Sequence, residues 1–223
     1  MTRGQIRIVG PRDRARLPAT TLTVDTTSHS LDAWTTELSP FHLGPCVVAG
    51  GRSARRMENA WQFSKVYAEH VGPDGTPSPA YWRWAESGWS SDRAVRYPRG
   101  KGARPAYLWW HGEPLAYVPG RLKAYWPLYR DAVIKTSAFA RLLELVDGGQ
   151  DVALFDFDGY DHDAAGVPLR DVLVDDTRPM GHAFVLKSLL LFGEQTSPEQ
   201  VLAEPAAAAV TPVRVHASQL AMF

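Results

Sequence analysis

Three polar side chains in the first half of the chain have the spacing of groups that act together. Glu58, Gln62 and Lys65 stand at i, i+4 and i+7 in a stretch, 56–69, whose apolar periodicity predicts a helix. On a helix this spacing places all three on one face. A carboxyl group beside an amide and an ammonium can act as a general acid or base, or stabilise a cation. The alternative is an ordinary solvent-exposed face, where such contacts contribute little.

A second group of carboxylates follows an apolar segment, 152–157, that predicts a buried strand. Carboxylates at the end of a strand are common in catalytic sites and in magnesium sites. Residues 152–159 match the signature of haloacid-dehalogenase-like phosphatases, in which the first Asp is the nucleophile and the second is the general acid. That motif opens a Rossmann-like fold, whereas only 67 residues follow Asp156 and Tyr160 replaces the usual Thr, so a phosphatase is a minor alternative. The carboxylates of this group are Asp156, Asp158, Asp161 and Asp163.

The histidines and the cysteine do not have the spacing of metal ligands. The seven histidines show no HxxxH, HxH or HExxH pairing, and the single cysteine, Cys46, excludes an internal disulfide or a multi-cysteine zinc site. No metal and no other cofactor is therefore expected. His182 stands at the start of a helix predicted over 181–192, where it would cap the helix or contact a phosphate.

The net charge of zero hides an asymmetry along the chain. Residues 52–130 hold 13 Lys plus Arg against 6 Asp plus Glu, and the rest of the chain holds 11 against 18. Most of the Trp and Tyr residues lie in the same basic segment. Cations interleaved with flat rings suit a phosphate-bearing ligand that also has a base to stack on. The alternative is that the rings form core and the cations a solvated face.

The pattern of the elements that must position these groups predicts an α+β or mixed α/β fold. We expect a compact, mainly helical single domain with a few short strands. The 126–146 helix has Pro127 in its first turn and Gly148-Gly149 beyond its end. Helices are expected at 56–69, 80–87, 126–146 and 181–192, strands at 21–25, 45–49, 106–110, 152–157 and 213–216, and a turn at 111–114.

The order of these motifs resembles that of the NADAR family, a group of N-glycosidases that act on ribosylamine and ADP-ribose derivatives. The family's strongest motif is a helix beginning Glu-His-x-x-Gln-x-x-Lys, which residues 58–65 match with Asn59 in place of His. Residues 38–41 weakly match its first loop. Trp126 resembles the tryptophan that opens a later long helix of the family.

The second half of the resemblance concerns the acids and the last helix. Asp156 and Asp161 have the spacing of the family's two acids, and residues 181–190 loosely resemble its closing helix, with Ala183 in place of Asn. The Trp-Gly that follows the family's second acid is missing after Asp161, so Asp158 is an alternative to it. On this reading residues 1–30 are an N-terminal arm, 31–193 the NADAR-like domain with an aromatic and basic insertion at about 72–121, and 194–223 a tail.

The resemblance implies hydrolysis of the C1–N bond of a ribosylated base, either ADP-ribosylated guanine in nucleic acid or a related nucleotide derivative. A carboxylate would stabilise the positive charge that develops on the ribose, and neither metal nor redox cofactor is needed. The alternative is a module that binds ADP-ribose or nucleic acid without cleaving it. The resemblance makes Glu58 and either Asp161 or Asp158 catalytic, and assigns substrate binding to Trp126, Gln62, Lys65, Asp156, Asn59 and His182.

The expected partner is a phosphorylated, nucleotide-type substrate, with DNA or RNA as an alternative, and no membrane. Residues 1–18 contain five arginines and no apolar run long enough for a signal peptide or a membrane span. A cytoplasmic location is therefore expected. The sequence gives no indication of the oligomeric state.

Overall fold

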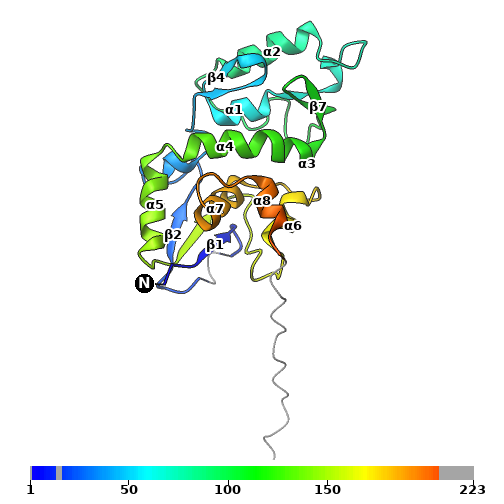
Figure 1. The fold of residues 1–223 in the computed structure, drawn as a ribbon. Coiled ribbons are helices and arrows are strands. Elements are labelled where there is room, and N and C mark those ends of the chain that lie inside the picture. The colour runs from blue at the N-terminus through cyan, green and yellow to red at the C-terminus, as the bar shows by residue number, and fades with distance from the viewer. Residues whose placement is uncertain (1, 14–16, 206–223) are drawn as a thin grey trace, which may run out of the picture.

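The apolar segment that predicts a buried strand forms β8 (Val152–Phe155), whose residues are all buried at the centre of a three-stranded parallel sheet. In this computed structural model, which describes residues 2–13 and 17–205, β8 lies between β1 (Ile6–Val9) and β2 (Leu22–Asp25) (Figure 1). Val9 and Asp25 both pair with Phe155, so the carboxyl ends of the three strands meet at one edge. Residues 1–30, expected as a polar arm, thus contribute two strands to this sheet.

A long helical run separates this sheet from a second layer of helices. The run consists of α3 (Tyr117–Gly120), a π-helical turn (Arg121–Tyr125) and α4 (Trp126–Val133). Figure 1 shows it between the layer of α1 (Met57–Gln62) and α2 (Pro79–Trp89) and the layer of the sheet and α7 (His182–Phe192). Both layers pack on α4, through α1 on one side and α7 on the other.

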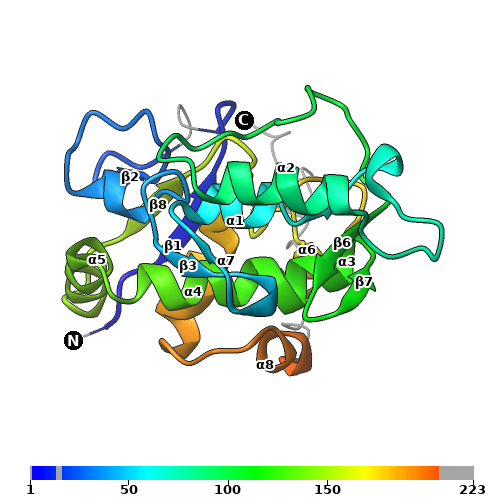
Figure 2. The ribbon, with the colours of Figure 1, turned by 90° about the horizontal axis from the view of Figure 1, so that it is seen from above.

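Two small antiparallel sheets and further helices complete the molecule. Figure 2 shows α5 (Ser137–Asp147) at one end of the helical run and the hairpin of β6 (Tyr107–Trp110) and β7 (Glu113–Leu115) at the other. The hairpin turns at His111 and Gly112, which both have positive φ, as the sequence predicts for 111–114. The remaining elements are β3 (Cys46–Val47), β4 (Ser53–Ala54), β5 (Lys65–Val66), β6 (Tyr107–Trp110), β7 (Glu113–Leu115), α5 (Ser137–Asp147), α6 (Leu169–Val174) and α8 (Pro198–Ala203), with 3-10 turns at Thr35–Leu38, Ala49–Gly51 and Ala68–His70.

Two predicted helices are wrong in extent. The helix expected over 56–69 ends at Gln62, because residues 64–66 are drawn into pairing with β6, where the Trp109 amide donates to the Ser64 carbonyl (2.8 Å). Lys65 therefore lies on a strand. The helix expected over 126–146 begins nine residues earlier and breaks at 134–136, where the Thr136 hydroxyl caps α5 by accepting from the Phe139 amide.

The other predicted elements are found or lie outside the described residues. The strands at 21–25, 106–110 and 152–157 and the helices at 80–87 and 181–192 are confirmed within a few residues. The strand expected at 45–49 shrinks to the two residues of β3, and the one expected at 213–216 lies outside the described ranges. Together the elements form a compact mixed α/β domain, with about 39% helix and 13% strand. Within the described ranges, no helix is both long enough and apolar enough to cross a membrane.

Candidate functional site

A pocket of about 470 Å³ opens beside the edge where the three parallel strands end. This volume lies in the range of small-molecule sites, and ligands of parallel sheets commonly bind beyond the carboxyl ends of the strands. The pocket is lined from both layers of the domain. The polar side chains in its lining include Glu58, Gln62, Lys65, Arg96, Asp156, Asp158 and His182.

Glu58 reaches the pocket from α1, a helix whose six residues are all buried. The interpretation of Glu58 and Gln62 as an ordinary solvent-exposed face is therefore wrong. Gln62 Nε2 donates to Glu58 Oε1 (2.9 Å), and Lys65 Nζ donates to Gln62 Oε1 (2.7 Å). This chain of hydrogen bonds fixes the orientation of the amide and holds one oxygen of the Glu58 carboxyl group.

Burial brings the pKa values of two of these groups close to neutral pH. Desolvation raises the pKa of Glu58 from 4.5 to about 7, although the hydrogen bond from Gln62 and the charge of Lys65 oppose the shift. Desolvation likewise lowers the pKa of Lys65 to about 8, against the attraction of Glu58. A carboxyl group that gains and loses its proton near pH 7 is suited to proton transfer at that pH.

Asp158 meets Arg96 across the pocket, with Arg96 Nη2 2.5 Å from Asp158 Oδ2. Burial raises the pKa of Asp158, and the attraction of Arg96 opposes that rise. Glu58, Arg96 and Asp158 all line the pocket, where the charge of Arg96 lowers the pKa of Glu58 and that of Asp158 raises it.

Asn59, which stands where the NADAR family has His, does not line the pocket but positions the segment that carries Arg96. Its fully buried side chain donates from Nδ2 to the carbonyls of Gly88 (3.0 Å), Ser91 (3.3 Å) and Arg93 (2.9 Å). Its Oδ1 accepts from the Val95 amide (2.9 Å). Helix α1 therefore supplies Glu58 to the pocket and, through the next residue, fixes the backbone that leads to Arg96.

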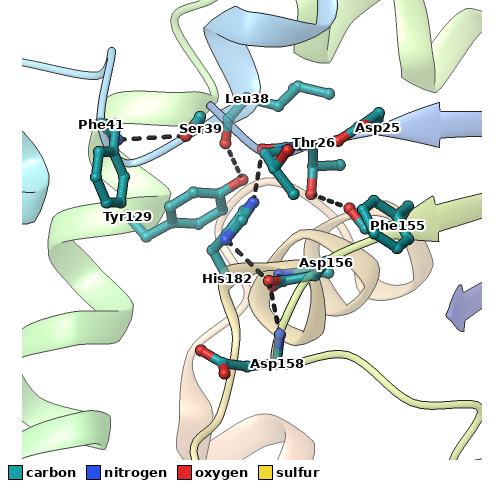
Figure 3. A network of polar contacts seen from close by, with 12 residues as sticks. Asp25, Thr26, Leu38, Ser39, Phe41, Tyr129, Phe155, Asp156, Asp158 and His182 are labelled. Atoms are coloured by element: carbon teal, nitrogen blue, oxygen red, sulfur yellow. Dashed lines mark hydrogen bonds and ion pairs between the residues drawn. The ribbon is translucent and has the colours of Figure 1, made fainter. Parts of the chain in front are cut away.

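Asp156 follows β8 and is fixed at the N-terminus of α7, as Figure 3 shows. Its Oδ1 accepts from the Asp158 amide (3.2 Å), and its Oδ2 accepts from the Ala183 amide (3.2 Å) and lies 3.2 Å from His182 Nδ1. A Cβ at Gly181 would lie 2.1 Å from Oδ2, so only glycine leaves room for this carboxylate. The positive end of the helix dipole also favours a negative charge here.

The polar network continues from His182 into the sheet and the long helical run. His182 Nε2 donates to the Thr26 carbonyl (2.9 Å), and the Thr26 hydroxyl donates to the Phe155 carbonyl (2.8 Å) (Figure 3). Tyr129, whose ring lies 5.4 Å from that of His182, donates to the Leu38 carbonyl (2.8 Å). These contacts fix His182 against the ends of β2 and β8.

The 38–41 loop, which weakly matches the first NADAR motif, forms part of the pocket lining. Ser39, Pro40 and Phe41 all line the pocket. The Pro40 carbonyl accepts from the Glu58 amide (2.9 Å), so this loop also holds the start of α1.

The aromatic wall of the pocket is built by Trp61 and Tyr125, whose rings meet edge to face at 5.2 Å. Burial raises the pKa of Tyr125 well above its usual range, so its hydroxyl remains a neutral donor. Trp126, the predicted stacking residue, is instead fully buried and donates to the Thr196 carbonyl (3.1 Å). The π-helical turn just before Trp126 presents Arg121 and Tyr125 to the pocket, a use typical of such turns.

The structure brings six of the nine predicted site residues into the pocket lining and leaves three outside it. The three residues outside the lining are Asn59, Trp126 and Asp161. Asp161 Oδ1 accepts from the Ala164 amide (3.0 Å) within its own loop. Sequence reasoning missed Trp61, Arg96 and Tyr125 as lining residues. Trp61 stands three residues after Glu58, which is a usable helical signal, whereas Arg96 and Asp158 are 62 positions apart and leave no local signal. The six in the lining are Glu58, Gln62, Lys65, Asp156, Asp158 and His182.

Most cations of the basic 52–130 segment that form ion pairs do so on the surface, away from the pocket. Arg99, for example, pairs with Glu69. Several rings of the segment are core residues, among them Tyr81 and Trp89. These contacts favour the interpretation of the segment as core plus a solvated face. The other surface pairs of its cations are Arg52–Glu86, Arg55–Asp92, Lys123–Glu113 and Arg130–Asp131.

Comparisons of the chain with protein-family models, curated proteins and solved structures found no match. Within the described ranges, no group of three or more His, Cys, Asp or Glu side chains could hold a metal ion. A functional assignment therefore depends on the chemistry of the pocket and on the order of the motifs that build it.

Proposed function

We propose that the chain is an N-glycosidase that hydrolyses the C1–N bond of a ribosylated base. The substrate would be ADP-ribosylated guanine in nucleic acid or a related nucleotide derivative. The observation that carries the proposal is that Glu58 and Asp158, carboxyl groups from separate elements, line one pocket beside an aromatic wall, with Asp156 next to Asp158. The resemblance of the motif order to the NADAR family points to the same reaction.

The two carboxyl groups have different partners, since Glu58 accepts from Gln62 and Asp158 is paired with Arg96. Glu58, with its pKa near 7, is the group proposed to donate a proton to the leaving nitrogen as the C1–N bond breaks. Asp158 would stabilise the positive charge that develops on the ribose. It would also take a proton from the water whose oxygen forms the new bond to C1. Gln62 holds Glu58 Oε1, which leaves Oε2 to carry the transferred proton.

The other lining groups have roles in binding rather than in bond breaking. The Trp61 and Tyr125 rings form a wall suited to a flat base or to the apolar face of a ribose. In place of Trp126, these two residues are the proposed stacking partners. Asp156 and His182, fixed by each other and by α7, would orient Asp158 through its amide hydrogen bond to Asp156.

A phosphatase is a second candidate because Asp156 and Asp158 follow the central parallel strand, where the haloacid-dehalogenase signature would place them. Its nucleophile would be Asp156. Both oxygens of that side chain are already engaged, by the amides of Asp158 and Ala183 and by His182. The glycosidase therefore accounts better for the arrangement of the carboxylates.

The test is cleavage of ADP-ribosylated guanosine to guanosine and ADP-ribose, and of a ribosylaminopyrimidine phosphate to its pyrimidine base and ribose phosphate, followed chromatographically with the purified chain. The proposal expects release of guanosine or of the pyrimidine base, together called base release, from at least one substrate, and its loss in Glu58→Gln. Glu69→Gln, at an exposed carboxylate outside the pocket, is the control and keeps the parental rate. Release of inorganic phosphate without base would favour the phosphatase. Tight binding without any product would favour the non-catalytic module.

A further inference from the structure

Among the described residues, three cationic side chains line the pocket, and two of them are already engaged by the protein. Lys65 donates to Gln62 and lies 4.9 Å from the centre of the Trp61 ring. Arg121 is almost fully buried under the Tyr117 ring. Its guanidinium donates to four backbone carbonyls around the C-terminus of α6, those of Val172, Leu173, Asp175 and Arg178.

Arg96 is the third cation, and it is available to a ligand. A guanidinium has five N–H donors. Within the part of the chain that the structure describes, the only hydrogen bond that the Arg96 guanidinium donates is the one from Nη2 to Asp158. About a third of the Arg96 side chain is exposed, and the Asn59 contacts hold the preceding backbone in place. Arg96 is thus a positioned cation with unused donors at the pocket.

We propose that Arg96 is an anion subsite for a phosphate or diphosphate group of the ligand, and that this anion displaces Asp158 from Arg96 on binding. The identity of the ligand rests on the proposed function, but anion binding does not require that hydrolysis occurs. A phosphate accepts two parallel hydrogen bonds from a guanidinium, and it competes with a carboxylate for the same face of Arg96.

The exchange links ligand binding to the chemistry proposed for Asp158. In the free protein the attraction of Arg96 lowers the pKa of Asp158 against the effect of burial. When phosphate takes the guanidinium, Asp158 loses that attraction and becomes a stronger base. A ligand that carries phosphate therefore activates the carboxylate, whereas the corresponding nucleoside leaves it paired with Arg96.

Binding of inorganic pyrophosphate, measured by calorimetry at low ionic strength, tests the subsite without any turnover. Arg96→Ala is expected to weaken binding by roughly tenfold to a hundredfold, the range for loss of a hydrogen bond to a charged group. Arg99→Ala removes the same charge from the same loop, where Arg99 pairs with Glu69 at similar exposure outside the pocket. This control is expected to bind pyrophosphate as the parent does. Equal losses in both variants, or no binding to the parent, would overturn the proposal.

The displacement of Asp158 makes a second and less obvious prediction. Asp158→Asn removes the competitor, so pyrophosphate should bind roughly tenfold more tightly than to the parent. In the Arg96→Ala background the same substitution should give little gain, because no guanidinium remains to be released. A gain of the same size in both backgrounds would mean that Asp158 only repels anions, and would refute the exchange. Thermal unfolding of each variant checks that it is folded.

These measurements separate this inference from the proposed function. If the chain is no glycosidase, base release is absent while the dependence of pyrophosphate binding on Arg96 and Asp158 remains. If the subsite is wrong, pyrophosphate binding does not depend on Arg96, whereas base release and its loss in Glu58→Gln are unaffected.

Discussion

Glu58→Gln is expected to make the protein more stable at alkaline pH while it removes activity. The folded-state pKa of Glu58, about 7, lies above the unfolded value of 4.5. The unfolded chain therefore releases this proton first, and the folded protein loses stability as the pH rises from about 4.5 to about 7. The lost stability reaches on the order of 3 kcal/mol above pH 7, at 1.36 kcal/mol for each unit of pKa shift.

Part of this cost is offset by Lys65, so the gain from the substitution is smaller. Without the charge of Glu58, the pKa of Lys65, which burial already lowers to about 8, falls further. Removal of the Lys65 proton on folding at pH 9 then costs more free energy. The glutamine still accepts the hydrogen bond from Gln62 that Glu58 Oε1 accepts. We expect a net gain on the order of 1–2 kcal/mol at pH 9, a rise in Tm of about 2–8 °C for a domain of this size.

Urea unfolding of the parent and of Glu58→Gln, from about pH 4.5 to about pH 9, measures this difference directly. The variant should gain stability relative to the parent as the pH rises, and the difference should be smallest near pH 4.5, where the side chain at position 58 is uncharged in both folded proteins. Glu69→Gln is the control. Hydrogen bonds with its own backbone and with Arg99 lower the pKa of Glu69, so loss of this carboxylate is not expected to stabilise the folded protein as the pH rises. A difference that is independent of pH, or a variant that is less stable at pH 9, would refute the burial argument.

Three further predictions concern Asp156, the catalytic proton and metal ions. Gly181→Ala places a Cβ in the space of the Asp156 carboxylate and breaks its contacts with Ala183 and His182. It should lower the free energy of unfolding in urea by about 2–4 kcal/mol and abolish turnover. An unchanged stability would contradict the close contact. The kcat/KM should fall as the pH rises through about 7, because Glu58 must be protonated to donate, and a rate that rises through this range would exclude it as the acid. Base release should be insensitive to EDTA and to added magnesium, and loss of activity in EDTA that magnesium restores would revive the phosphatase.

The sequence predicts those parts of the fold that local patterns determine. The buried strand at 152–155 and the helix at 182–192 are nearly continuous apolar runs. The break at 134–136 was missed because the apolar spacing continues through it, and only the Thr136 cap marks the second helix. Strand β1 is flanked by Gly4 and Gly10-Pro11, but its four residues are short and lie within an arginine-rich start, so they do not stand out as a strand.

The site was predictable where one element carries several of its groups. Glu58 and Gln62 share a helix, and Asp156 and Asp158 follow one strand, so their spacing is visible in the sequence. Arg96 is different, because the hydrogen bonds of a buried Asn59 bring it to the pocket from an irregular segment. No periodicity in the sequence records such a tertiary contact.

The most direct test of the central claim is to determine which product receives the oxygen atom of the attacking water. The chain is incubated with ADP-ribosylated guanosine in water enriched in oxygen-18. The products are reduced with borohydride, so that the oxygen on C1 no longer exchanges with water, and their masses are measured by mass spectrometry. Hydrolysis at C1 of the ADP-ribosyl group predicts unlabelled guanosine, label in ADP-ribose and none in inorganic phosphate, with all product absent in Glu58→Gln. Label in inorganic phosphate, or unchanged product formation by Glu58→Gln, would contradict the account.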